Sequence, residues 1–144
     1  MSGDADKVIY WDASAILSTL FTDKHSAEAK IWVQKEYIHL VSTLAYSETC
    51  SVIARLNREA HLSDILIKTA FKMLEEGPWS FTRAWPEWET VRTLSNKWSL
   101  CGAGLWHLAT AINLKEQLPE LFLLTFDLRL QDAADGEGLL EFER

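Results

Sequence analysis

Apolar and polar positions follow two different periods along this chain. Short apolar runs of strand length occupy residues 8–11 and 121–126, and residues 38–41, which include one histidine, form a further segment of strand length. Runs of this length are typical of strands that are buried on both faces of a parallel sheet. The longer segments between them place apolar residues three and four positions apart, which is the helical period. The alternation of strands and helices with short connections predicts a sheet covered by helices on both sides.

The pattern predicts seven helices, over residues 14–21, 27–35, 44–57, 63–75, 86–98, 105–114 and 128–134. Ser42 or Thr43 can cap the third, Gly77-Pro78 ends the fourth, and Pro86 is placed to open the fifth because proline is tolerated in a first helical turn. Strands are expected at 8–11, 38–41, 121–126 and 139–142, with a brief strand or extended segment at 79–82. We therefore expect one domain over residues 1–144, a three-layer α/β/α sandwich with a mostly parallel five-stranded sheet.

Length and composition agree with a single soluble domain. The 144 residues are 48% hydrophobic, enough to build one core. No apolar run approaches the roughly 18 residues of a membrane span, and the polar, acidic start does not resemble a secretory signal. Cys50 and Cys101 have neither the spacing of a zinc or redox site nor the density of a disulfide scaffold. We expect a cytoplasmic protein in which both cysteines are reduced packing residues.

The charge balance restricts the possible partners. Fourteen Lys and Arg against 21 Asp and Glu give a formal net charge of −7, and the basic residues are scattered. This argues against tight nucleic-acid binding by charge alone. A polyanionic substrate would need a bound cation and local arginines to offset the acidic field. Arg55, Arg58 and Arg129 lie near acidic candidates in sequence and could contact phosphate, although arginines at such positions are more often solvated helix-surface residues.

Two aspartates follow apolar runs directly and open helical patterns. Asp12 comes after residues 8–11 and Asp127 after residues 121–126. Because the carboxyl ends of parallel strands face one crevice, these two side chains can converge. Aspartate at such a position also commonly caps the following helix, so either residue alone has a purely structural explanation. Convergent carboxylates without zinc-type ligands indicate a hard divalent cation.

Glu48 interrupts an apolar helical stripe. Leu44, Glu48 and Val52 recur every four residues and share one helix face. A buried ion pair is the structural alternative, but the residues three and four ahead, Ser51 and Val52, supply no basic partner. A partly buried carboxylate needs a cation or hydrogen-bond donors, and a metal ion would serve.

Histidine and tryptophan allow further interpretations. His107 can be a ligand or an acid–base group, but a helical histidine between apolar residues is more often packed and hydrogen bonded, and we favour packing. The seven tryptophans, including Trp85, Trp88 and Trp98, can stack on bases, but aromatics at helical spacing more often belong to a core or a subunit interface. We assign them no stacking role.

Four segments, in order and nearly spanning the chain, resemble the PIN domain family, specifically the VapC-like ribonuclease toxins of toxin-antitoxin pairs. The segments are YWDASAIL at 10–17, SET at 47–49 followed by VIAR at 52–55, LWHLATA at 105–111 and LLTFDLRL at 123–130. The resemblance implies a doubly wound sheet whose carboxylates hold Mg²⁺ or Mn²⁺ and activate water to cut RNA. Asp12, Glu48 and Asp127 match acid positions and would be the metal ligands, and Ser14 and Thr125 would be their hydroxyl partners. It also implies an antitoxin that covers the acidic crevice, and a homodimer.

One position departs from the family pattern. The third motif of similar proteins begins with an aspartate three residues before the histidine, where this chain has Gly104. Glycine has no ligating side chain, so the site loses an oxygen ligand and a negative charge. Three outcomes are open: the remaining acids suffice for a weakly held metal, His107 reaches in with a preference for manganese, or binding persists without cleavage.

Two other functions compete with the metal-dependent ribonuclease. Gly104 and the acidic net charge favour a degenerate, non-catalytic PIN module that binds RNA or protein. A Rossmann-like nucleotide binder is disfavoured because the turn after the first strand has no Gly-x-Gly-x-x-Gly loop.

Overall fold

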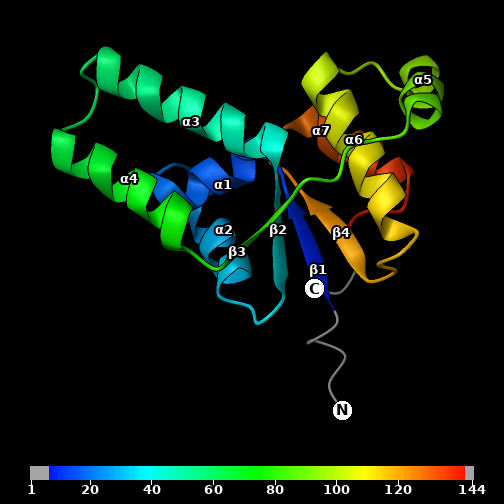
Figure 1. Cartoon of the computed structure of the whole chain (residues 1–144), viewed down its shortest axis with the longest axis horizontal. Coiled ribbons are helices and arrows are strands. Elements are labelled where there is room, and N and C mark those ends of the chain that lie inside the picture. Colours follow the sequence, from blue (N-terminus) through cyan, green and yellow to red (C-terminus); the bar gives the residue numbers. More distant parts are fainter. Residues whose placement is uncertain (1–6, 142–144) are drawn as a thin grey trace.

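The computed structural model describes residues 7–141, and this range contains four strands and seven helices (Figure 1). In chain order they are β1 (Val8–Trp11), α1 (Ala13–Leu20), α2 (Ser26–Val33), β2 (Ile38–Ser42), α3 (Thr43–Arg58), α4 (Asp64–Glu76), β3 (Trp79–Thr82), α5 (Trp88–Lys97), α6 (Gly102–Lys115), β4 (Leu121–Leu124) and α7 (Leu128–Gly136). None of these helices is both long and apolar enough to cross a bilayer.

The four strands form one parallel sheet in the order β3-β2-β1-β4. Helices α1 to α4 cover one face and α5 to α7 cover the other, on the left and right of Figure 1. Successive side chains of a strand point to opposite faces. In β1, Ile9 and Trp11 therefore join the core beneath α1, α3 and α4, whereas Val8 and Tyr10 join the core beneath α5, α6 and α7. This is the expected three-layer sandwich.

The sheet has four strands in the described range, not five. Residues 139–141 form no strand, and the remainder of the expected last strand, Phe142, lies outside the described residues. Leu139 is fully buried, and its carbonyl accepts one backbone hydrogen bond from Leu123 at 2.8 Å. The apolar pattern of this segment reflects burial of Leu139 beside β4. A single backbone hydrogen bond joins the described residues of the segment to β4, and they do not form the repeated hydrogen bonds of a paired strand.

Two helix starts also differ from the prediction. Pro86 does not open a helix: α5 begins at Trp88, after Glu87 in the extended N-cap conformation. Helix α6 begins at Gly102, three residues earlier than expected, because the Cys101 thiol accepts a hydrogen bond from the amide of Gly104 and caps the helix. The glycines at 102 and 104 are therefore part of the first turn of α6 and do not form a break before it.

Strand β4 ends at Leu124, two residues before the end of the apolar run. The amide of Phe126 donates to Ser14 Oγ at 3.0 Å, and Thr125 directs its hydroxyl to Asp12. These two residues leave the sheet because their polar groups bond to the start of α1. The end of β4 is thereby tied to the end of β1.

Candidate metal site at the carboxyl edge of the sheet

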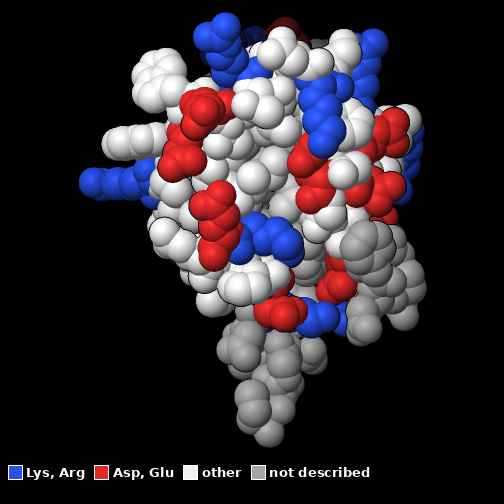
Figure 2. Space-filling view, turned by 90° about the vertical axis from the view of Figure 1, so that its right-hand side faces the viewer, with Lys and Arg blue, Asp and Glu red and all other residues white. Residues whose placement is uncertain are grey.

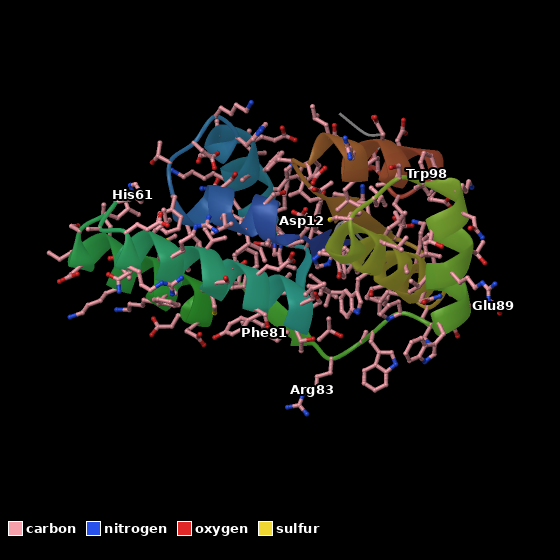
Figure 3. The ribbon with its side chains drawn as sticks, turned by 90° about the horizontal axis from the view of Figure 1, so that it is seen from above. Asp12, His61, Phe81, Arg83, Glu89 and Trp98 are labelled. Carbon is pink, nitrogen blue, oxygen red and sulfur yellow. The ribbon has the colours of Figure 1, made fainter. Side chains whose placement is uncertain are left out.

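The ends of β1, β2 and β4 lie side by side at one edge of the sheet. Trp11 pairs with Val41 on one side and with Leu124 on the other, so the next residues, Asp12, Ser42 and Thr125, are level with one another. The backbone amide of Asp12 donates to Leu124 O at 3.2 Å. Seen from above this edge, Asp12 lies near the middle of the molecule, between the two helical layers (Figure 3).

Asp12 is the most buried acid at this edge. It is the N-cap of α1, and its Oδ1 accepts hydrogen bonds from the amide of Ala15 at 2.9 Å and from Ser14 Oγ at 2.7 Å. Its Oδ2 accepts from Thr125 Oγ1. Burial raises the pKa of Asp12, and the hydrogen bonds from Thr125, Ala15 and Ser14 act against that rise. A cation placed beside this carboxylate would also favour its charged form.

Ser14 and Thr125 hold Asp12 in one orientation. Ser14 Oγ donates to Asp12 and accepts from the amide of Phe126, and the two hydroxyl oxygens lie 3.4 Å apart. Thr125 Oγ1 donates to Asp12 and accepts from the amide of Asp127 at 3.0 Å. Each hydroxyl thus has both a donor and an acceptor partner, which fixes its direction. The small polar network links the two strand ends that carry the aspartates.

Glu48 and His107 meet across the top of the sheet. Glu48 Oε1 lies 2.8 Å from His107 Nε2, although α3 and α6 cover opposite faces. The other ring nitrogen, His107 Nδ1, lies 2.7 Å from the hydroxyl of Tyr10. A neutral imidazole that donates from Nε2 to Glu48 and accepts at Nδ1 from Tyr10 satisfies all three groups. His107 is buried and hydrogen bonded, and its partner is a candidate site residue.

Two further observations place Asp12 in this neighbourhood. Burial is the main cause of the raised pKa of the Tyr10 hydroxyl, and the negative charges of Asp12 and Glu48 raise it further. A positive charge on His107, when it is protonated, would lower the pKa of Asp12 against the larger effect of burial. Asp12 and Glu48 therefore both lie near the Tyr10–His107 pair.

Asp127 is exposed and caps α7. Its Oδ1 accepts from the amides of Arg129 at 3.0 Å and Leu130 at 3.2 Å. Asp127 therefore has the helix-capping role that is the structural explanation for an aspartate at this position. Its Oδ2 has no hydrogen-bond donor in the described range. The backbone of Asp127 is two hydrogen bonds from Asp12, through Thr125 Oγ1.

Gly104 is buried in the first turn of α6, on the same helix face as His107 three residues later. The first turn of α6 contains no acidic residue. A Cβ at position 104 would make ordinary contacts, with Cys101 Sγ at 3.6 Å and with Leu100 Cβ at 3.7 Å. Space for a side chain exists, so close packing does not impose glycine at this position.

The residues present fit a magnesium ion only if water supplies most of its ligands. Among residues 7–141, no three His, Cys, Asp or Glu side chains are grouped closely enough to enclose a metal. Mg²⁺, however, keeps several waters and is usually held through one or two carboxylates. Asp12 Oδ2 has acceptor capacity left after its bond to Thr125, and Glu48 Oε2 has no donor partner within the described chain. The donor set fits a water-rich Mg²⁺ or Mn²⁺ site and does not fit a closed cage.

Of the three arginines considered for phosphate contact, only one lies at this edge. Arg129 is exposed in the first turn of α7, directly after the cap Asp127. Arg55 and Arg58 are exposed in the last turns of α3, about 10 and 15 Å along the helix axis from Glu48. On the face formed by α5, α6 and α7, basic side chains are separated by acidic and uncharged ones and form no continuous strip (Figure 2).

The structure contradicts a core position for two tryptophans. Trp85 and Trp88 are 76% and 93% exposed, whereas Trp11 is fully buried. Trp98 is half-buried and packs against the core beneath α5, α6 and α7. The spacing did not distinguish the two groups because Trp85 precedes α5 in an extended segment and Trp88 is its first residue.

Comparison with known proteins supports the same fold. The family model of the PIN domain matches residues 9–136. Among solved structures, PAE2754 from Pyrobaculum aerophilum is similar, with a TM-score of 0.62 and 18% identity over 93% of this chain and 85% of that chain. VapC20 of Mycobacterium tuberculosis, described as a sarcin-ricin loop cleaving toxin, has a TM-score of 0.58 and 14% identity over 94% and 99% of the two chains. No curated protein sequence matches significantly.

Proposed function

Because this chain belongs to the PIN domain family, we propose that it is an endoribonuclease of the VapC toxin type that depends on Mg²⁺ or Mn²⁺. PIN domains form a nuclease family, and VapC20, which has the same fold, is described as a sarcin-ricin loop cleaving toxin. The observation that carries the proposal is the placement of Asp12 in a hydroxyl network at the carboxyl edge of the sheet, with Glu48 held nearby by His107.

In this proposal Asp12 is the main metal ligand, and Glu48 and Asp127 complete the site directly or through water. A bound Mg²⁺ or Mn²⁺ would supply an activated water and stabilise the charge that develops when an RNA phosphodiester is cut in line. Ser14 and Thr125 keep the Asp12 carboxylate oriented. His107 keeps one oxygen of Glu48 occupied and leaves the other available.

A cleavage assay on single-stranded RNA tests the function. We expect cleavage with Mg²⁺ or Mn²⁺, loss of cleavage with EDTA, and loss of cleavage in Asp12→Asn. Asp132→Asn is the matched control, because Asp132 is an exposed carboxylate on α7 outside the network. Cleavage that persists in both EDTA and Asp12→Asn contradicts the proposal.

The alternative is a PIN module that binds RNA without cutting it. Gly104 favours this function, because the first turn of α6 then presents backbone amides without a carboxylate, and helix N-termini favour anions. Absence of cleavage under every metal condition, together with RNA binding that Asp12→Asn does not weaken, would support the alternative.

We also propose the partners that accompany this function. They are an RNA substrate, an antitoxin protein that covers the acidic crevice, and a second copy of the chain, all in the cytoplasm. Exposed apolar residues on α4, among them Ile65 at 75% and Leu66 at 50%, offer area for a dimer interface. Light scattering on wild type and on Ile65→Lys would test the homodimer: a monomeric mass for wild type contradicts it.

A further inference from the structure

A hollow of about 570 Å³ opens at the same edge of the sheet as Asp12. It lies between the first turn of α3, the end of α4 and the end of β3. Ser42 pairs with Thr82, and Asp12 is level with Ser42, so the three residues form a row across neighbouring strands. Neighbouring strands are about 4.8 Å apart, which puts Thr82 roughly 10 Å from Asp12. This distance is comparable to the size of one nucleotide.

Two aromatic rings form one wall of the hollow. Phe81 is 52% exposed, and Tyr46 packs against it with ring centroids 5.7 Å apart and ring planes at 85°. Because the two rings are perpendicular, they are not stacked face to face, and a ring face remains open on this wall. An open aromatic face is the feature on which unpaired bases stack in single-stranded RNA.

A carboxylate also lines the hollow, next to the Tyr46 ring. Glu75, near the end of α4, accepts a hydrogen bond from the Tyr46 hydroxyl through Oε2. In the described part of the chain it has no Lys, Arg or His partner, and its Oε1 has no donor. An oriented, unpaired carboxylate accepts N–H groups from a ligand. Guanine is the base that presents two adjacent N–H groups, N1–H and N2–H, on one edge.

Positive charge and further exposed aromatics continue from the hollow. Arg83 lines its mouth and points away from the body of the molecule (Figure 3). Trp85 and Trp88 follow at 76% and 93% exposure along the same segment. Alternating aromatic and basic side chains are typical of a binding path for single-stranded nucleic acid, in which cations bind phosphates and rings stack on bases. A purely apolar protein partner would desolvate Glu75 Oε1 without giving it a hydrogen-bond donor.

We propose that this hollow binds one unpaired guanine of the RNA substrate. Phe81 stacks on the base, Glu75 accepts from its Watson–Crick edge, and Arg83 contacts the neighbouring phosphate. The inference rests on the proposed ribonuclease function and deepens it, because it assigns a base preference next to the candidate metal site.

Binding of four labelled heptanucleotides tests the proposal. Each is oligouridine with G, A, C or U at the centre, and fluorescence anisotropy is measured in low salt with EDTA so that no cleavage occurs. Since a good bidentate contact to a base discriminates by about 10-fold, we expect the G probe to bind roughly 10-fold more tightly than the others. Glu75→Gln should reduce this preference to about twofold or less, because the amide replaces one acceptor oxygen with a donor.

Two further variants separate the components of the binding site. Phe81→Ala should weaken all four probes alike, since stacking is tolerant of base identity. Glu76→Gln is the matched control: Glu76 is the next residue of α4, is exposed and does not line this hollow, so the G preference should persist. Equal affinity for the four probes, or no binding of any, overturns the proposal. A change of oligomeric mass in Phe81→Ala without a base preference would assign the surface to protein contacts and overturns it too.

The outcome is separable from that of the proposed function. Guanine preference without metal-dependent cleavage would retain this binding site and refute the nuclease. Metal-dependent cleavage with a base preference that Glu75→Gln leaves unchanged would retain the nuclease and refute the guanine site.

Discussion

Replacing Gly104 by aspartate should restore a carboxylate to the candidate metal site. Position 104 is in the first turn of α6 and shares a helix face with His107, which contacts Glu48. A Cβ there meets its nearest neighbours at 3.6 to 3.9 Å, so the first side-chain atom of the aspartate makes ordinary van der Waals contacts. We therefore expect the Gly104→Asp variant to fold as the wild type does.

The stability of the metal-free variant should change little. A negative charge in the first turn of a helix contributes about 0.3–1 kcal/mol, and replacing glycine in a helix contributes a few tenths more. Against this, the new carboxylate would be repelled by Glu48 and Asp12. For any two carboxylates at a separation of about 8 Å the repulsion is roughly 2 kcal/mol at an effective dielectric constant near 20, before screening by salt. Because these contributions oppose each other, the free energy of unfolding without metal should shift by about 1 kcal/mol or less in either direction.

Metal affinity should change much more. Removing a partner that merely orients a ligand typically costs about 10- to 100-fold in metal affinity or activity, so restoring an acid of the site itself should raise Mn²⁺ and Mg²⁺ affinity by at least ~10-fold. Nuclease activity should rise with it, because more of the enzyme is loaded at a given metal concentration.

Isothermal titration with Mn²⁺ measures the effect, and two variants control for it. Gly104→Asn has the size of the aspartate without its charge. Gly102→Asp places the same charge in the same helical turn, at a position where an added Cβ meets nothing within 4 Å. If Gly104→Asp binds Mn²⁺ no more tightly than either control, then position 104 does not belong to the site.

Three further predictions follow from buried polar groups. Because burial raises the pKa of Asp12, the folded state loses stability as the pH rises through that raised pKa. Asp12→Asn should therefore melt at a higher temperature than wild type at pH 7.5 in EDTA, and the difference should shrink in acid. A melting temperature below that of wild type at pH 7.5 would refute this. Burial lowers the pKa of His39, whose ring accepts a hydrogen bond from Trp11 Nε1 at 3.0 Å. The contribution of His39 to the stability of the fold is therefore complete above the unfolded pKa of about 6.5 and declines below it. In thermal melts, the His39→Gln variant should lose less stability than wild type between pH 7 and 5. His107→Leu should lower the free energy of unfolding by about 1–3 kcal/mol in urea titrations, and an additive double mutant with Tyr10→Phe would exclude the buried hydrogen bond as the cause.

Much of the fold could be predicted because each apolar run carries its own local signal. The strands at 8–11 and 79–82 match the structure residue for residue, and the four residues of β4 lie within the predicted 121–126. The prediction failed where burial and strand pairing separate. Leu139 is buried beside β4 with a single backbone hydrogen bond to that strand, and Phe126 is apolar but turns away to donate to Ser14. An apolar pattern records burial, and it does not record whether a backbone ladder accompanies that burial.

The candidate site could be predicted only where it depends on strand ends. Asp12 and Thr125 are level with each other because β1 and β4 are neighbours in register. The β–α alternation predicts only that these strand ends face the same crevice, and it does not predict that the two strands are neighbours. The partner of Glu48 could not be found in this way, because His107 is 59 residues further along the chain and on the opposite helical layer. A search for basic residues one turn along the same helix excludes only local pairs. The exposure of Trp85 and Trp88 was equally invisible, since it depends on where α5 begins.

The contacts of His107 argue against one of the three outcomes that the missing acid leaves open, in which His107 itself binds manganese. A manganese ligand needs an imidazole nitrogen with a free lone pair, but Nε2 is 2.8 Å from Glu48 and Nδ1 is 2.7 Å from the Tyr10 hydroxyl. For His107 to ligate a metal, it would have to give up one of these bonds and leave a buried polar group unpaired, which costs about 1–3 kcal/mol. His107 is therefore better placed to orient Glu48 than to replace the acid at Gly104. The choice that remains is between a metal held mainly by Asp12 and Glu48 and a site that binds RNA without cutting it. The cleavage assay on wild type and Asp12→Asn, with and without metal, separates these two.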